Sequence, residues 1–272
     1  MRENSIPQHL GNEAENEDMT IESILDLPME LMAENQDFAM AAMNQTKKLM
    51  TEVVEYKELM MMYTCAMKEI RTKFDVLNTE FNVRYQRNPI NFINTRLKRF
   101  SSILDKLEKK NIPITLGNVE EYVKDVAGVR VICSYVDDIY EIAKTFVHQD
   151  DIVLLEEKDY IAKPKENGYR SLHLIVQVPV FFANQTKNMT VEVQIRTIAM
   201  DFWASLEHQL KYKQEVENEQ EIIDELKECA DIIASTDERM LKIRQGIDMN
   251  KSMPSDDEIL FEKIRKIDVA IE

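Results

Sequence analysis

The sequence has 272 residues and a formal net charge of −16, with 44% hydrophobic and 31% charged residues. This is a globular composition with room for one substantial domain and its appendages, or for two small domains. The acidic balance argues against nucleic acid as the main partner, and the lack of a signal peptide or of an apolar run of roughly 18 residues argues against a membrane protein. Three widely spaced cysteines form no C-x-x-C pair, so we expect a cytoplasmic protein.

Residues 1–37 hold ten acidic residues against a single basic one, Arg2. Such a biased segment is typical of a solvated, flexible extension, and a regulatory arm is the alternative. We therefore expect an N-terminal extension over 1–37 and the main domain over 38–250. A helical tail is expected over 251–272.

One long helix is predicted over residues 38–80, because apolar side chains recur there at helical spacing. The stripe consists of Met43, Met50, Val54, Met61, Met67, Ile70, Phe74 and Leu77. A second helix is predicted to begin at Asn88-Pro89, an N-cap followed by proline, and to continue to Leu107. Its apolar face would be Ile93, Leu97, Phe100, Leu104 and Leu107. Lys98, Ser102 and Lys106 would share one edge of it, since they are four residues apart.

The middle of the chain predicts a mixed α/β region. Strands are expected over 129–135, 152–155, 172–180 and 189–197, the last two as a hairpin. A helix is expected over 138–147, and a loop over 158–169 that is marked by Pro164 and Asn167-Gly168. From about Ala199 the chain is predicted to be helical, and apolar residues from Ile222 to Ile247 form a heptad-like seam. The seam packs either on its own domain or on another subunit.

Two carboxylates on separate elements suggest a metal site. Asp125 precedes one predicted strand, and Glu192 lies on the polar face of another, together with Gln194 and Arg196. A sheet with its polar face in solvent is the simpler interpretation of either strand alone. However, Mg²⁺ prefers a few carboxylate oxygens together with water and substrate phosphate.

Cations gather around these carboxylates in the sequence, at Arg96, Lys98, Lys106, Arg130, Lys158, Lys163, Lys165, Arg170 and Arg196. Metal and cations together are what phosphoryl transfer requires. In the loop, Gly168 permits a turn that other residues resist. Tyr169 is placed to stack a base, and Lys165 and His173 to reach phosphates.

Four ordered motifs then resemble the synthetase domain of the RelA/SpoT family. They are Arg96–Arg99, Asp125–Arg130, Gly168–His173 and Glu192–Thr197, and the run from Ala199 to His208 continues the match. The resemblance covers residues 40–245 and is closest to the short, single-domain members called small alarmone synthetases. It implies an α+β fold of the nucleotidyltransferase-like type, with a mixed central sheet flanked by helices and long terminal helices. It also implies a homo-oligomer, expected to be a homotetramer.

The resemblance implies transfer of pyrophosphate from ATP to the 3′-hydroxyl of GDP or GTP, giving AMP and ppGpp or pppGpp. Asp125 and Glu192 match the Mg²⁺ ligands, and Glu192 also matches the group that activates the hydroxyl. The ATP-binding positions are Arg96 and Arg130, which sandwich adenine, and Lys106 and Lys158, which hold phosphates. Tyr169 matches the residue that stacks guanine. The other contacts to the guanine nucleotide are Lys98, Ser102, Lys165, Asn167 and His173.

Departures from the family pattern narrow this expectation. No His-Asp pair is present, so the hydrolase activity of the long members is not expected. Asp201 stands where one branch has an asparagine that binds an activating alarmone at the tetramer centre, and its charge should repel such an anion there. Two rival functions stay open: a toxin that pyrophosphorylates the 3′ end of tRNA, and an inactive oligomer that binds nucleotides or RNA.

Overall fold

The computed structural model describes residues 29–211 and 219–250. The chain forms two compact units, Met1–Glu55 and Tyr56–Glu272. The boundary lies within helix α2 (Met29–Tyr85) and not near residue 38, where the main domain was expected to begin. Among the described helices, none combines the length and apolarity that a membrane span requires.

Helix α2 begins at Met29, so it includes the end of the segment that was predicted as an extension. Residues 29–37 are thus helical, which acidic charge does not exclude, and the division into an extension and a main domain stays a prediction. Met, Glu, Leu and Ala, which are frequent in this stretch, are all strong helix formers. Residues 1–28 and the predicted tail over 251–272 lie outside the described residues.

One face of the second part of α2 is buried in the core of the larger unit. Its buried side chains recur at helical spacing: Leu59, Met60, Tyr63, Ala66, Met67, Ile70, Phe74, Leu77 and Phe81. The ring of Phe74 stacks on that of Phe146, with centroids 4.4 Å apart. The predicted stripe is therefore right only in its second half. Its first four members are exposed, namely Met43, Met50, Val54 and Met61.

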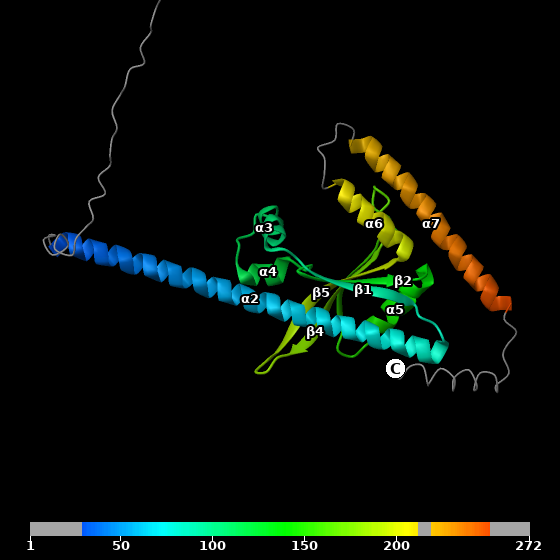
Figure 1. Ribbon diagram of the computed structural model, residues 1–272, viewed down its shortest axis with the longest axis horizontal. Helices are drawn as coiled ribbons and strands as arrows, with labels where there is room; N and C mark the ends of the chain where they lie inside the picture. The colour runs from blue at the N-terminus through cyan, green and yellow to red at the C-terminus, as the bar shows by residue number, and fades with distance from the viewer. Residues whose placement is uncertain (1–28, 212–218, 251–272) are drawn as a thin grey trace, which may run out of the picture. The chain divides into compact units, whose positions relative to one another are not determined.

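A five-stranded mixed sheet with the order β1-β2-β5-β4-β3 forms the centre of the larger unit (Figure 1). The strands are β1 (Ile90–Leu97), β2 (Ala127–Cys133), β3 (Val153–Asp159), β4 (Leu172–Phe181) and β5 (Thr186–Thr197). Strands β2 and β5 are parallel, and the other neighbouring pairs are antiparallel. The predicted hairpin over β4 and β5 is confirmed, and the mixed α+β class with it.

The helix predicted from Asn88 to Leu107 is wrong in its first half. Residues 90–97 form strand β1, which pairs with β2, and helix α3 (Phe100–Glu108) begins only after Arg99. The sequence of β1, INFINTRL, is poor in strong helix formers and rich in β-branched residues and asparagine. The 4-3 spacing of its apolar residues was therefore misleading. Helix α4 (Leu116–Tyr122), capped by the Thr115 side chain, was not predicted.

Helices cover the sheet and supply the rest of the core. Helix α5 (Val136–Val147) buries Ile139, Ile142 and Phe146. Helix α6 (Ile198–Lys211) follows β5 directly and packs against β5 and β2, and α7 (Glu219–Asn250) lies along α6 (Figure 1). Trp203 and Ala204 of α6 pack with Ala230 of α7.

Candidate functional site

The polar residues of the sheet line up across neighbouring strands. Arg96 is paired in register with Gly128, and Gly128 with Glu192. One row further along, Arg130 is paired with Gln194, and Gln194 with His173. Alternate residues of a strand point to the same face. The register therefore brings side chains from four separate motifs onto one face of the sheet.

A cavity of about 480 Å³ opens on this face. Its lining residues are Asn94, Arg96, Lys98, Ser102, Asp125, Gly128, Val129, Arg130, Glu192, Gln194 and His208. Both predicted metal ligands and four of the predicted nucleotide contacts thus share one cavity. The sequence reading did not assign Asn94, Gln194 or His208 to the site. Asn94 and Gln194 stand two residues from Arg96 and Glu192 on their strands, and this alternation was the available signal.

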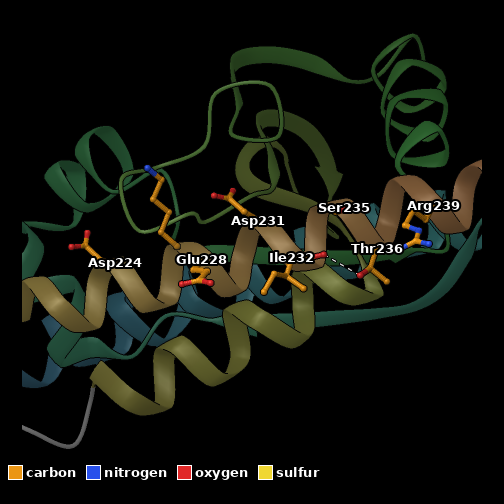
Figure 2. A pocket seen from close by; sticks show the side chains of 8 residues that line it. Asp224, Glu228, Asp231, Ile232, Ser235, Thr236 and Arg239 are labelled. Atoms are coloured by element: carbon orange, nitrogen blue, oxygen red, sulfur yellow. Dashed lines mark hydrogen bonds between the residues drawn. The ribbon is translucent and has the colours of Figure 1, made fainter.

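A second, larger hollow of about 640 Å³ runs along α7 (Figure 2). All its lining residues come from that one helix: Asp224, Lys227, Glu228, Asp231, Ile232, Ser235, Thr236 and Arg239. Charges of both signs along one helix face are typical of a surface in solvent. The cavity on the sheet is therefore the candidate site.

Asp125 is held between two lysines. Its Oδ2 accepts a hydrogen bond from Lys98 Nζ at 2.9 Å, and its Oδ1 accepts one from Lys106 Nζ at 2.8 Å. Burial raises the pKa of Asp125, but the two ammonium groups outweigh it and hold the pKa below its ordinary value. Lys98 lies in the turn before α3 and Lys106 on the helix, so they meet at Asp125 although they do not share one continuous helix.

Glu192 is held by hydrogen-bonding groups on both oxygens. Oε1 lies 3.2 Å from Nδ1 of His173, and Oε2 accepts a bond from Gln194 Nε2 at 2.8 Å. Burial raises the pKa of Glu192, and so does the charge of Asp125, but the contacts of His173 and Gln194 leave it below the ordinary value. Asp125 and Glu192 line the same cavity, and the charge of Asp125 acts on Glu192 there.

The loop between β3 and β4 holds Tyr169 at the edge of the site. Nζ of Lys165 lies 4.8 Å from the centre of the Tyr169 ring, and the Tyr169 hydroxyl lies 2.7 Å from Nε2 of His173. The Asn167 side chain donates to Glu207 of α6 at 3.1 Å. These residues lie around Tyr169, but they do not line the cavity itself, and their contacts to a guanine nucleotide stay a prediction.

Gly168 fits this loop for two reasons. Its φ is +84°, a region that other residues rarely adopt. In addition, a Cβ at this position would lie 2.5 Å from Cβ of Ala230 on α7. The neighbouring Arg170 donates to the carbonyl of Ala230 and to Asp231. The Tyr169 loop is therefore fastened to α7.

Asp201 of α6 lies between two arginines, one of which, Arg130, lines the cavity. Its Oδ1 accepts hydrogen bonds from Arg130 and from Arg196, each at 3.1 Å. The expectation that its charge disfavours an activating anion at a tetramer centre stays a prediction. Lys158, predicted to hold ATP phosphates, is the last but one residue of β3 and pairs with Glu156 at 3.0 Å. It does not line the cavity.

The donor set fits a magnesium ion that shares its coordination with substrate. In the described parts of the chain, no group of three or more His, Cys, Asp or Glu side chains is placed to hold a metal. Two interacting carboxylates on one cavity remain, and Mg²⁺ is typically held by one or two carboxylates together with waters and substrate phosphates. Asp125 and Glu192 are the residues that would hold it.

Comparison with known proteins identifies the family. A family model described as a region found in RelA / SpoT proteins matches residues 95–217. GTP pyrophosphokinase YwaC of Bacillus subtilis (strain 168) is 42% identical over 200 residues, which are 74% of this chain and 95% of that protein. The crystal structure of small alarmone synthetase 2 from Bacillus subtilis has a TM-score of 0.64 and 42% identity, over 70% of this chain and 98% of the other.

Small alarmone synthetase 1 from Bacillus subtilis is a further relative, solved with its product pppGpp and with AMPCPP. The pppGpp complex is 34% identical with a TM-score of 0.65, over 71% of this chain and 98% of the other. The AMPCPP complex is 31% identical with a TM-score of 0.61, over 72% and 98%. By sequence and by fold, the chain therefore belongs to the RelA/SpoT family, among its small alarmone synthetases.

Proposed function

We propose that the chain is a GTP pyrophosphokinase that moves pyrophosphate from ATP to the 3′-hydroxyl of GDP or GTP. The hydroxyl oxygen bonds to the β-phosphorus of ATP, the bond from that phosphorus to the α,β-bridging oxygen breaks, and AMP leaves. The products are AMP and ppGpp or pppGpp. The observation that carries the proposal is one cavity that joins two interacting carboxylates with Arg96, Lys98 and Arg130. The relative that was solved with pppGpp as its product supports it.

Glu192 is the group that accepts the proton of the attacking hydroxyl. Its lowered pKa keeps it ionised at neutral pH, and its contacts to His173 and Gln194 fix both oxygens. Asp125 lines the same cavity and binds Lys98 and Lys106. When nucleotides bind, these two lysines would contact phosphate oxygens. When bound by Asp125 and Glu192, Mg²⁺ would neutralise charge on the transferring phosphates.

The resemblance assigns these residues to the two nucleotides. Arg96 and Arg130, on adjacent antiparallel strands, would sandwich adenine, and Lys106 and Lys158 would hold the phosphates of ATP. Tyr169 would stack guanine. Lys98, Ser102, Lys165, Asn167 and His173 would supply the remaining contacts to GDP or GTP.

The assay that tests this proposal uses labelled ATP and Mg²⁺ with GDP, GTP or tRNA, and separates the products by chromatography. We expect label in ppGpp or pppGpp, and none in tRNA. Label in tRNA alone would point to the tRNA-modifying reaction. Unchanged ATP in every mixture would overturn the proposed enzyme.

We further propose that the chain assembles into a homotetramer. Leu226 and Ile233 of the α7 seam pack against α6, but Met240, Ile243 and Ile247 are each at least half exposed. An apolar face that its own domain leaves uncovered is typical of a protein–protein contact. Light scattering at micromolar concentration should give four chains per particle. A monomer would exclude the assembly.

A further inference from the structure

Glu192 belongs to a closed ring of hydrogen bonds formed by five side chains. Gln194 Nε2 lies 2.8 Å from Glu192 Oε2, and Gln194 Oε1 lies 2.8 Å from an Arg196 nitrogen. The same Arg196 nitrogen lies 2.6 Å from the Tyr169 hydroxyl, which lies 2.7 Å from Nε2 of His173. His173 Nδ1, 3.2 Å from Glu192 Oε1, closes the ring.

Two members of the ring have a single role, because Arg196 can only donate and the ionised Glu192 can only accept. A guanidinium has five N–H donors and no acceptor, whereas glutamine, tyrosine and neutral histidine can each donate and accept. Gln194 must therefore turn its carbonyl oxygen to Arg196, which leaves its NH₂ for Glu192. The Tyr169 hydroxyl accepts from Arg196, and its proton is available to Nε2 of His173 because Nδ1 of that ring faces the acceptor-only Glu192.

This order of donors decides where the proton of His173 lies. A ring nitrogen that accepts from Tyr169 carries no hydrogen, so a neutral imidazole has its hydrogen on Nδ1. Nδ1 is the nitrogen that faces Glu192. Both oxygens of Glu192 thus receive a hydrogen bond, and the direction of each agrees with a donor-only Arg196 at one end of the ring and an acceptor-only Glu192 at the other.

Arg196 is itself held on every nitrogen. Its Nε donates to Ser171, one terminal nitrogen donates to Asp201, and the other donates to both Gln194 and Tyr169. Only 4% of the side chain is exposed. Asp201 also binds Arg130, so one carboxylate fixes Arg196 and the expected adenine-binding arginine together. The ring therefore has a rigid anchor.

We propose that Arg196 is a positioning residue for the reaction, which orients Glu192 through Gln194 and, through Tyr169, stabilises the Nδ1–H tautomer of His173 that Glu192 also favours. The role of Glu192 in this inference rests on the proposed function, but the tautomer does not. If the Arg196–Asp201 ion pair were purely structural, loss of Arg196 would change stability alone. A positioning role predicts that its loss also changes the tautomer of His173 and lowers kcat.

The first test is long-range ¹H–¹⁵N NMR of the histidine rings in the full chain without nucleotides. The chain has only four histidines, and the His173 signals are assigned by their loss in His173→Gln. We expect the Nδ1–H pattern for His173 in the unaltered protein, and a share of the Nε2–H tautomer in Arg196→Met. A ring with hydrogen on Nε2 in the unaltered protein, alone or on both nitrogens, would overturn the inference.

The second test compares turnover. In Arg196→Met, kcat should fall about 10- to 100-fold, the range seen when a residue that orients a catalytic ligand is lost. The KM for ATP should change little, and Arg196→Lys should recover part of kcat because lysine also only donates. Folded Arg196→Met with unaltered kcat would contradict the inference. If the unaltered chain makes no alarmone, the proposed function fails, and the tautomer still decides this inference.

Arg244→Met provides the matched control. Arg244 binds Asp137 at 2.7 Å, lies over the Tyr135 ring and is 20% exposed, so its loss also removes a partly buried ion pair. None of these partners belongs to the ring around Glu192. The tautomer of His173 and the kcat of the folded variant should therefore match the unaltered protein.

Discussion

The two carboxylates of the site are held in opposite ways. Asp125 is bound by two flexible lysines, whose side chains are partly exposed at 23% and 36%. Glu192 is bound by His173 and Gln194 within a ring that a buried arginine anchors. Lysine is a point charge on a flexible stem, whereas an arginine bound on each of its nitrogens is fixed in geometry.

This difference suggests separate tasks for the two carboxylates: Asp125 and its lysines balance charge, and Glu192 takes part in proton transfer. The lysines at Asp125 can turn to phosphate oxygens when nucleotides enter, so they neutralise the free site and then the bound one. As the proposed base, Glu192 must keep its orientation while it accepts a proton, because general base catalysis depends on geometry within hydrogen-bond reach. The comparison predicts that changes at Glu192 act on kcat, and changes at the lysines on KM.

The largest effect is expected from Glu192→Gln. The change is nearly isosteric but removes the proton acceptor, so kcat should fall about 10²- to 10⁴-fold while the fold is kept. Steady-state kinetics on the purified variant, with its circular dichroism as a check of folding, would measure this. Glu157→Gln, on the exposed edge strand β3, is the control and should behave like the unaltered chain. Near-normal turnover of Glu192→Gln would remove Glu192 as the base.

Tyr169 should show a mixed effect, because its ring is the proposed stacking face for guanine and its hydroxyl belongs to the ring around Glu192. Stacking contributes on the order of 1–3 kcal/mol per base, so Tyr169→Ala should raise the KM for GDP or GTP about 5- to 150-fold, and that for ATP far less. Tyr169→Phe keeps the stacking face and should lower kcat instead. Equal effects of Tyr169→Ala on both substrates would assign the residue to the core.

Sequence reasoning found this site more reliably than it found the elements that carry it. Arg96 was expected on a helix and lies on strand β1, yet it lines one cavity together with Asp125 and Glu192. The motif supplies the residue types, and spacing alone does not distinguish strand from helix in a short segment such as INFINTRL. Lys98 and Lys106 were likewise expected on one helix. Lys98 precedes α3 and Lys106 lies on it, yet both bind Asp125.

The ring around Glu192 could be foreseen only in part. The alternation in β5 placed Glu192, Gln194 and Arg196 on one face, and that prediction is confirmed by their mutual contacts. Their closure through Tyr169 and His173 depends on the order of β4 and β5 in the sheet and on the loop that α7 holds. Asp201 was assigned from the resemblance alone, and only the tertiary structure shows that it binds two arginines.

A smaller effect is expected at the Asp125 side of the comparison. Hydrogen bonds to charged groups contribute about 1.5–3 kcal/mol, so Lys106→Met should raise the KM for ATP by roughly tenfold or somewhat more. The kcat should stay near that of the unaltered chain, because Glu192 keeps its partners. Lys110→Met, at an exposed position just after α3, controls for the loss of one positive charge. A fall in kcat with unaltered KM would show that the two carboxylates do not divide their tasks.

The smallest effect concerns stability in acid. The pKa values of Asp125 and Glu192 are lowered in the folded state, from ordinary values of 3.8 and 4.5. Ionised groups of this kind stabilise the fold fully above those ordinary values, and the contribution is lost as the pH falls through the lowered pKa. Below about pH 4, the free energy of unfolding should therefore drop more steeply for the unaltered chain than for Asp125→Asn.

Urea unfolding of the two proteins between neutral pH and about pH 3 measures this difference. The gap between their unfolding free energies should be widest at neutral pH and should close in acid, because a protonated Asp125 no longer attracts Lys98 and Lys106. Glu192→Gln should show the same trend with a smaller gap, since Glu192 is held by hydrogen bonds more than by opposite charge. Parallel curves for all three proteins would mean that the lysines hold Asp125 without stabilising the fold. The contrast between the two carboxylates would then be one of catalysis alone.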